Sequence, residues 1–408
     1  MGSLAEWRRG WRTVASSFVG VIFMAAVPTV TGVVMAPLRA EFGWSRSIIA
    51  ANVFICSVMT LVLAPSAGRL IARFGPRRCA LAAITAAIPA LLLIALTGGS
   101  PLTWLGAWFI YAVINLGISP IIWSGAVAGL FDRARGMALA VTLSGAGLAY
   151  FVFPPLAVAV LTEFGWRGVY VTLAVLFLVV LLPLCYAWFR SASDLPDTTR
   201  SGEQPAGPVT AVGFALGEAL RMRQFWQFAG VAALMAIAEG ALQVHFFPIL
   251  QEGGLSAGEA AWVASMMGIA MVVGRILAGY MQDKLPPLPV FGCSILFVLA
   301  SCLLLRYSTG DTLMGTAVSI CLGLGAGGTT IGLAYLASRY FGLLAYPSIY
   351  GLLMGGFSLG YGAAPVVAGH LREVSGSYVP IFNWLAAILA VAAALTWLLG
   401  PSKLRPTS

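Results

Sequence analysis

The chain has 408 residues, of which 60% are apolar and only 9% are charged. An ordinary soluble domain carries about 45–50% apolar and about 25% charged residues, and a single soluble core stops growing near ~250–300 residues. These proportions exclude a water-soluble enzyme and indicate an all-α polytopic membrane protein. Twelve membrane helices of ~20 residues each would use ~240 residues, which agrees with the apolar share.

The net charge of +9 comes from 23 Lys and Arg residues against 14 Asp and Glu. The basic residues form short clusters between apolar runs, without the surface stripe that a phosphate backbone requires, so no nucleic-acid partner is expected. The six cysteines lie inside or at the ends of apolar segments and form neither a CxxC pair nor a metal-ligand spacing. We therefore expect packing cysteines, with no metal and no cofactor.

Apolar runs in chain order predict twelve membrane-spanning helices. Their approximate ranges are 13–38, 47–72, 79–97, 103–130, 136–162, 168–189, 225–250, 257–283, 288–308, 312–338, 344–369 and 377–400. The first run is too long for a cleavable signal and is expected to be retained. The polar stretch 191–223, rich in Pro, Ser, Gly and charge, predicts a linker between six-helix domains at 1–190 and 224–408.

The distribution of Lys and Arg among the loops predicts the orientation. An even number of spans puts both termini on one side, which carries 17 of the 23 basic residues against 5 on the other. This excess predicts that both termini and the linker are cytoplasmic in a multi-pass protein of the cell (inner or plasma) membrane. The one remaining basic residue, Arg275, falls inside a predicted span.

The two halves share a feature at the end of their second helix. The segment GRLIARFGPR at 68–77 closes the second span, and GYMQDK at 279–284 takes the corresponding place after the eighth. Their first glycines stand 211 positions apart, close to half the chain. This spacing predicts a duplicated, pseudo-symmetric pair of bundles, and such repeats place substrate sites near the midplane between the halves.

At these residues the sequence resembles the major facilitator superfamily over essentially its full length. The residues that the resemblance marks as its conformational motif are Gly68, Arg69, Gly75, Arg77, Arg78 and Asp283. The first half has Ala72 where the family usually has an acid, so one partner of the family's charge lock is missing there. The resemblance implies a secondary transporter that works by alternating access.

Further segments are similar to the monocarboxylate porter and oxalate:formate antiporter branch, whose members move small organic anions. These segments are EFGWSR at 41–46, FDRARGMALA at 131–140 with SGAG at 144–147, and RYFG at 339–342. Pro154-Pro155 stands without the flanking glycines of the drug-exporter motif. The resemblance favours a proton-coupled transporter of a monocarboxylate or similar anion, with an exporter of amphipathic compounds as the alternative.

Arg275 is the principal candidate for substrate binding. It lies eight residues, or ~12 Å, from Asp283 at the end of the eighth span, close to the middle of a ~30 Å core. A guanidinium at this depth faces a cavity or a counter-ion, and its planar fork matches a carboxylate. The resembling porters also use an arginine here. The alternative is a structural ion pair with Glu239.

The seventh span carries the other two ionisable candidates. Glu239 is a candidate proton carrier, with a partner for Arg275 or a protonated packing acid as alternatives. The proton relay of the resembling porters is not copied, because span one lacks a lysine and Met271 stands where an acid would precede Arg275. The resemblance makes His245 a candidate for substrate binding or proton coupling, against a hydrogen-bonded packing histidine.

Three uncharged residues complete the candidate substrate site. Asn115 must find a partner in protein or water, and the resembling porters place a cavity asparagine in its span; a helix–helix hydrogen bond is the alternative. Five glycines in span ten allow close packing and are expected to leave a wide face beside Thr330, suiting a substrate larger than lactate or formate. Ser358 lies in the glycine-rich span eleven. One intramembrane arginine and no lysine favour one carboxylate group over two.

The sequence carries no sign of catalysis. It has no HExxH, GxSxG or clustered His/Asp set, and it has no P-loop, so a gradient rather than ATP is expected to supply energy. We expect a non-enzymatic monomer in the lipid bilayer, with a small organic acid as substrate and protons as the coupling ion.

Overall fold

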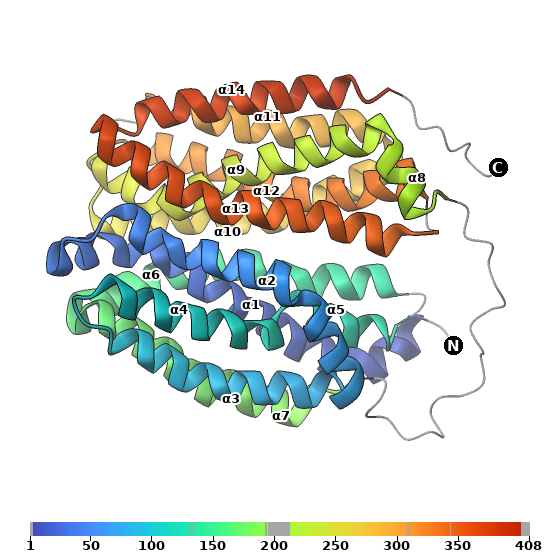
Figure 1. Ribbon diagram of the computed structural model, residues 1–408, viewed down its shortest axis with the longest axis horizontal. Helices are drawn as coiled ribbons and strands as arrows, with labels where there is room; N and C mark the ends of the chain where they lie inside the picture. Colours follow the sequence, from blue (N-terminus) through green and yellow to red (C-terminus); the bar gives the residue numbers. More distant parts are fainter. Residues whose placement is uncertain are drawn as a thin grey trace. The chain divides into compact units, whose positions relative to one another are not determined.

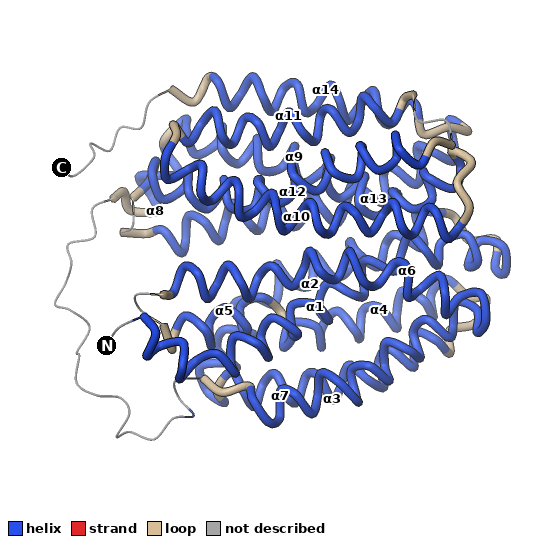
Figure 2. The backbone as a smooth tube through the Cα atoms, turned by 180° about the vertical axis from the view of Figure 1, so that it is seen from behind, coloured by secondary structure: helices blue, strands red, loops and turns tan. Residues whose placement is uncertain are grey.

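The computed structural model describes residues 3–131, 134–191, 194, 213–307, 310–342 and 344–400. Within these ranges the chain is helical almost throughout (Figure 2), and extended pairing is confined to a single bridge between Gly213 and Gly342. The apolar runs dictate this outcome, because an unpaired backbone N–H or C=O costs several kcal/mol in a bilayer and a helix pairs them internally. The predicted all-α membrane fold is confirmed.

The chain divides into two compact units, Met1–Gly202 and Glu203–Ser408. In unit 1 (Figure 1) the helices are α1 Ser3–Phe42, α2 Arg46–Phe74, α3 Pro76–Ala95, α4 Pro101–Asn115, η1 Leu116–Ile118, α5 Pro120–Ala128, α6 Arg135–Leu176, η2 Phe177–Leu181 and α7 Leu182–Trp188. In unit 2 they are α8 Leu216–Arg221, α9 Arg223–Glu252, α10 Ala257–Lys284, α11 Pro287–Leu305, α12 Thr312–Phe341, α13 Tyr346–Ser375 and α14 Val379–Trp397. Of the predicted linker, residues 192, 193 and 195–212 lie outside the described part, and α8 lies near its C-terminal end.

Eleven stretches of the described chain are long and apolar enough to cross a membrane. One of them, Arg135–Trp188, has 54 residues and would extend ~80 Å as a single helix, against a hydrocarbon core of ~30 Å. Gly165 interrupts it with φ 68° and ψ −176°, between the predicted spans 136–162 and 168–189. This stretch therefore makes two crossings, and all twelve predicted spans are present.

Helix boundaries repeat between the two units. The starts of three helix pairs stand 211 positions apart: Arg46 and Ala257, Pro76 and Pro287, and Pro101 and Thr312. The helices also pack in corresponding pairs: α1 with α6 as α9 with α13, α2 with α4 as α10 with α12, and α3 with α6 as α11 with α14. The predicted duplication therefore extends from one motif to the whole scaffold.

The turns after the first and fifth crossings of each unit repeat at the same interval. Gly43 and Gly254 have φ values of 68° and 107°, and Gly165 and Gly376 have φ values of 68° and 70°. Glycine reaches positive φ without the steric penalty that a Cβ imposes. Glycine therefore allows a positive φ at these four turns, although ψ differs within the second pair, at −176° for Gly165 and 1° for Gly376.

The same interval relates two acidic residues that form ion pairs at the ends of the first helices. Glu41 of α1 pairs with Arg167, and Glu252 of α9 pairs with Arg372, each at 2.8 Å between side-chain N and O. Both pairs are partly exposed, so each contributes at most about 1 kcal/mol. They mark the repeat rather than a buried site.

The glycines of α12 bring α10 and α11 against it. In α10, a Cβ at Gly323 would overlap the carbonyl oxygen of Met267, and a Cβ at Gly327 would overlap that of Met271. A Cβ at Gly325 would meet the carbonyl oxygen of Ser294 in α11 at 2.8 Å. Small residues at a membrane interface allow helices to approach this closely. The predicted close packing of this glycine-rich helix is confirmed.

The expected wide face along these glycines is wrong. Side chains or backbone of α10 and α11 fill the space at all five positions; at Gly332, for example, the Phe291 ring occupies it. The neighbouring helices therefore fill the space that the missing side chains leave. The glycines do not enlarge a substrate site beside Thr330. The larger-substrate inference loses its support.

Substitution of Gly327 with alanine should destabilise unit 2, because the new methyl group meets backbone atoms that cannot swing aside. Overpacking of this kind costs typically about 1–3 kcal/mol. Gly351 of α13 is the matched control: a Cβ there meets nothing within 4 Å, and alanine favours a helix over glycine by about 0.5–1 kcal/mol. Thermal unfolding in detergent should show a lower midpoint for Gly327→Ala than for the native chain. The midpoint of Gly351→Ala should not decrease. Equal midpoints would contradict the packing described.

Candidate functional site

A buried acid of α9 forms the centre of a polar group inside unit 2. Glu239 is 3% exposed, and its Oε1 has no hydrogen-bond partner among the described residues. The Thr329 hydroxyl of α12 lies near this carboxyl and donates to the Gly325 carbonyl oxygen at 2.9 Å. Arg275 acts on the Glu239 carboxyl through its charge. The predicted Arg275 and Glu239 are therefore neighbours on adjacent helices.

The arginine of α10 contacts its own helix through its side chain, and α12 approaches its backbone closely. Its Nη2 lies 3.8 Å from the sulfur of Met271, one turn earlier, and its backbone nitrogen lies 2.9 Å from the position a Cβ on Gly327 would occupy. The side chain is half-buried. A half-buried guanidinium keeps its charge, so this site always contains a cation.

Two residues of this group were not among the sequence candidates. Thr329 precedes the predicted Thr330 and points about 100° away from it around the helix. Tyr350 of α13 lies within electrostatic range of Arg275 and stacks on Tyr346, with ring centroids 5.5 Å apart. The sequence did contain a signal for the stacking of Tyr346 and Tyr350: they stand four residues apart, which puts both rings on one face of a helix.

The chemistry of the group follows from its charges. With Glu239 ionised, its negative charge balances the positive charge of Arg275; protonation of Glu239 removes that negative charge. A carboxylate supplies that missing charge and accepts two N–H groups from the guanidinium fork. Among the described residues, no three His, Cys, Asp or Glu side chains gather to hold a metal ion.

His245 lies on α9 in a different setting. It is 1% exposed; its Nε2 lies 2.9 Å from the Pro365 carbonyl oxygen and its Nδ1 2.9 Å from the Tyr378 hydroxyl. A carbonyl only accepts, so Nε2 carries the proton and Nδ1 of the neutral ring accepts from the tyrosine. This geometry fits the packing alternative; the roles of His245 in substrate binding or proton coupling stay predictions.

Removal of the tyrosine hydroxyl tests that packing role. Tyr378→Phe should lose about 1 kcal/mol of stability, which lowers the unfolding midpoint by about 2–4 °C, while the pH profile of uptake stays unchanged. Tyr307→Phe, at a tyrosine 71% exposed, should alter neither. A shifted pH profile in Tyr378→Phe would assign His245 to proton coupling instead.

The three uncharged candidates are dispersed. Thr330 turns its hydroxyl to the Ala326 carbonyl oxygen at 3.4 Å, and Ser358 lies half-buried on α13, about two turns beyond Tyr350. Asn115 belongs to unit 1, at the last residue of α4, and its Oδ1 is buried without a hydrogen-bond partner among the described residues. The substrate-binding roles of all three stay predictions.

The motif residues form the connection between α2 and α3. Gly75 ends α2 and begins α3 with φ 83°, a conformation that favours glycine. Arg69 donates to Ser66 Oγ at 3.1 Å, and Arg77 donates to the Tyr186 carbonyl oxygen at 2.7 Å, while Arg78 is exposed. The side-chain surroundings of Gly68 and Asp283 lie outside the described part.

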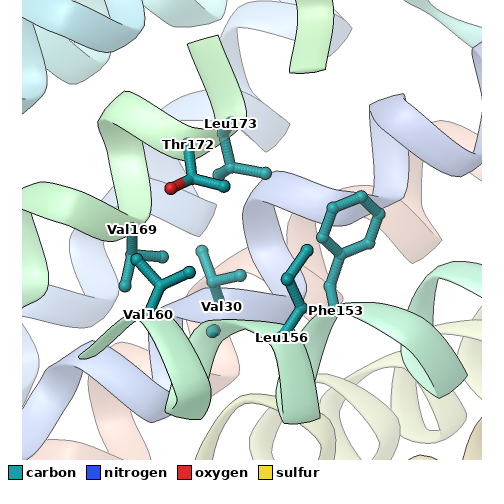
Figure 3. A pocket seen from close by; sticks show the side chains of 8 residues that line it. Val30, Phe153, Leu156, Val160, Val169, Thr172 and Leu173 are labelled. Carbon is teal, nitrogen blue, oxygen red and sulfur yellow. The ribbon is translucent and has the colours of Figure 1, made fainter. Parts of the chain in front are cut away.

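A small hollow in unit 1, with a volume of about 10 Å³, has different chemistry. It lies between α1 and the parts of α6 before and after Gly165 (Figure 3). Its lining consists of seven apolar residues and Thr172. A single hydroxyl cannot compensate the charge of a carboxylate. This hollow therefore does not add to the charged group of unit 2.

The charged group belongs to one half of the repeat only. At the positions 211 residues before Glu239 and Arg275 the chain has Pro28 and Ala64. At these two pairs of positions the chain therefore has an acid and a cation in unit 2 and uncharged residues in unit 1, although the helix arrangement repeats.

Two repeated sets of six membrane helices, with a buried acid and a cation inside one set, define a polytopic membrane transporter. The model of the Major Facilitator Superfamily matches residues 17–256 and 231–408. The chain belongs to this family, as its resemblance indicated.

Curated relatives refine this assignment. The chain is 26% identical over 407 residues to monocarboxylate transporter 13 of Bos taurus, covering 95% of this chain and 88% of that protein. It is 21% identical over 355 residues to the uncharacterized MFS-type transporter YhjX of Escherichia coli, covering 86% of each. The crystal structure of a bacterial homolog of the human lysosomal transporter Spinster matches with TM-score 0.74 and 16% identity over 96% of both chains. The last match shows the fold alone.

Proposed function

We propose that this transporter carries a small monocarboxylate together with a proton, through the group formed by Arg275 and Glu239. The observation that carries the proposal is the presence of a buried acid within electrostatic range of a membrane-embedded guanidinium. Polar groups placed inside a membrane at this energetic cost usually mark the path of a substrate or ion. The relatives named monocarboxylate transporters support the same substrate class.

Proton coupling follows from competition for the guanidinium. The ionised Glu239 carboxylate and a substrate carboxylate compete for the positive charge of Arg275. Two carboxylates beside one cation leave a net negative charge, which is unfavourable in a medium of low dielectric constant. Protonation of Glu239 removes one competitor, so substrate and proton bind together. The acid sits on α9, whereas the resembling porters have it one turn before the arginine on the same helix, where this chain has Met271.

The number of cations sets the substrate charge. Protonation of Glu239 removes one negative charge from beside Arg275; a monocarboxylate restores that one charge, whereas a dicarboxylate brings one more than was removed. The two units would then expose the site to each side of the membrane in turn, as inverted or parallel repeats do in other transporters. We place both termini in the cytoplasm on the strength of the Lys and Arg distribution.

Uptake into proteoliposomes with an imposed proton gradient tests the proposal. Radiolabelled lactate, pyruvate and benzoate should accumulate when the outside is acidic, and succinate should compete weakly. Uptake that ignores both the gradient and every carboxylate, with transport of amphipathic cations instead, would replace the proposal with an exporter of amphipathic compounds.

A further inference from the structure

The first turns of α1 present an exposed face of basic and apolar side chains. Four exposed residues form it: Leu4, Arg8, Trp11 and Arg12. At 100° per residue these four positions fall within about 100° of one another around the helix. The opposite face packs inside unit 1, where a Cβ on Gly10 would overlap the Phe131 ring. The first turns of α1 are therefore amphipathic, with their arginines on the outer side.

The length of α1 places this face at the edge of the membrane. The helix has 40 residues and extends ~60 Å, about twice the ~30 Å thickness of a hydrocarbon core. Its apolar run begins only at residue 13, so Arg8 and Arg12 precede the hydrocarbon. Tryptophan rings are enriched at the level of the lipid headgroups. The exposed face of α1 therefore lies among headgroups rather than acyl chains.

The end of α7 completes this surface. The Trp188 ring meets the Trp11 ring edge to face, with centroids 5.2 Å apart and planes at 67°. The Arg12 guanidinium lies 5.7 Å from the centroid of the Trp11 ring. Just beyond α7, the carbonyl oxygen of the exposed Arg190 accepts a hydrogen bond from the Thr13 hydroxyl at 2.9 Å. We call this set the α1–α7 surface: Arg8, Trp11, Arg12, Trp188 and Arg190.

The positive charge of the α1–α7 surface is not neutralised by the protein. Among the described residues, no Asp or Glu side chain forms an ion pair with its three arginines. The acids nearest in sequence are engaged elsewhere: Glu6 accepts from the Ala134 backbone nitrogen at 3.1 Å, and Asp194 accepts from the Ser191 hydroxyl at 2.6 Å. The surface therefore offers three guanidinium groups to a negatively charged partner.

The repeated scaffold does not require this surface. At the positions 211 residues after Arg8, Trp11 and Trp188 the chain has Ala219, Met222 and Leu399. The orientation of the protein needs only an excess of basic residues on one side of the membrane. It does not need arginines gathered around two tryptophan rings in contact. The α1–α7 surface is thus a feature of unit 1 with its own chemistry.

We propose that the α1–α7 surface binds the headgroup of an anionic phospholipid in the leaflet where α1 begins. The guanidinium forks donate paired hydrogen bonds to phosphate oxygens, and Leu4 and Trp11 contact the glycerol backbone and the upper acyl chain. A zwitterionic headgroup brings its own cation, which the three arginines repel, and a soluble anion makes no use of the apolar side chains. The site is independent of the substrate proposed above, since it involves other residues.

Native mass spectrometry of the intact transporter, titrated with phosphatidylglycerol or phosphatidylcholine, tests this site. Phosphatidylglycerol should bind more tightly to the native chain. Arg8→Gln combined with Arg12→Gln should raise its dissociation constant about tenfold or more, because each hydrogen bond between charged groups contributes a factor of about ten to a hundred. Both side chains are exposed, so the double variant should fold normally.

The matched control is Arg221→Gln combined with Arg223→Gln. These exposed arginines belong to unit 2, and their replacement removes the same two charges outside the proposed site, so the dissociation constant should not change. Equal dissociation constants for the native chain and Arg8→Gln/Arg12→Gln, or an equal increase in the control, would overturn the proposal. Phosphatidylcholine binding as tightly as phosphatidylglycerol would also overturn it. Displacement of the lipid by an equal concentration of glycerol phosphate would assign the surface to a soluble anion instead.

Discussion

Arg275→Lys should reduce kcat/KM for carboxylate uptake by about ten- to a hundredfold. Lysine keeps the positive charge but replaces the planar fork with a single ammonium point, so a paired hydrogen-bond contact to the carboxylate is lost. A hydrogen bond to a charged group contributes about 1.5–3 kcal/mol, and every ~1.4 kcal/mol is a factor of ten. Initial rates in proteoliposomes at several substrate concentrations measure the loss.

The matched control for this prediction is Arg372→Lys. Arg372 belongs to the same unit and holds Glu252 at 2.8 Å near the ends of α13 and α9, in a partly exposed pair. Its replacement should leave uptake within about twofold, because exposed pairs contribute at most about 1 kcal/mol. Arg275→Lys with the activity of this control would remove the arginine from substrate binding.

Glu239→Gln should abolish accumulation driven by a proton gradient while preserving exchange of substrate for substrate. Glutamine imitates the protonated acid in shape and charge, so Arg275 stays available to a carboxylate but no proton is bound or released. Net uphill uptake needs the empty site to return with its proton released, whereas exchange needs only the loaded site. Uptake under an imposed gradient and counterflow under equal pH separate these two processes.

Glu252→Gln is the control for this second variant, because it makes the same change thirteen residues further along α9. It should accumulate substrate normally. Glu239→Gln that still concentrates substrate against its gradient would assign the proton to another group, and loss of exchange together with accumulation would indicate a structural acid.

The architecture was accessible from the sequence because it follows from local and repeated features. Apolar runs of membrane length give the crossings, and the interval of 211 between Gly68 and Gly279 recurs in the structure at helix starts and at Gly165 and Gly376. An ion pair between Arg275 and Glu239 was one alternative that the sequence offered; the structure shows an electrostatic influence of Arg275 on Glu239, and their roles in transport stay predictions.

The rest depended on rotation about helix axes and on partners distant in sequence. Thr329 rather than Thr330 approaches Glu239, a difference of one residue and about 100°. His245 forms a hydrogen bond with Tyr378, more than a hundred positions away. No local sequence pattern predicts such a contact. The glycines of α12 illustrate the same difficulty, because a missing side chain can mean open space or a close helix, and only the neighbouring helices decide between them.

Proton uptake on substrate binding tests the exchange at Arg275 most directly. Calorimetric titration of the purified transporter with its preferred monocarboxylate, in buffers of different ionisation enthalpy, counts the protons taken up as the acid binds. At a pH where Glu239 is ionised in the empty protein, we expect this exchange to take up about one proton per carboxylate in the native chain and none in Glu239→Gln. Binding of the carboxylate without proton uptake in the native chain, or with equal uptake in both proteins, would contradict it.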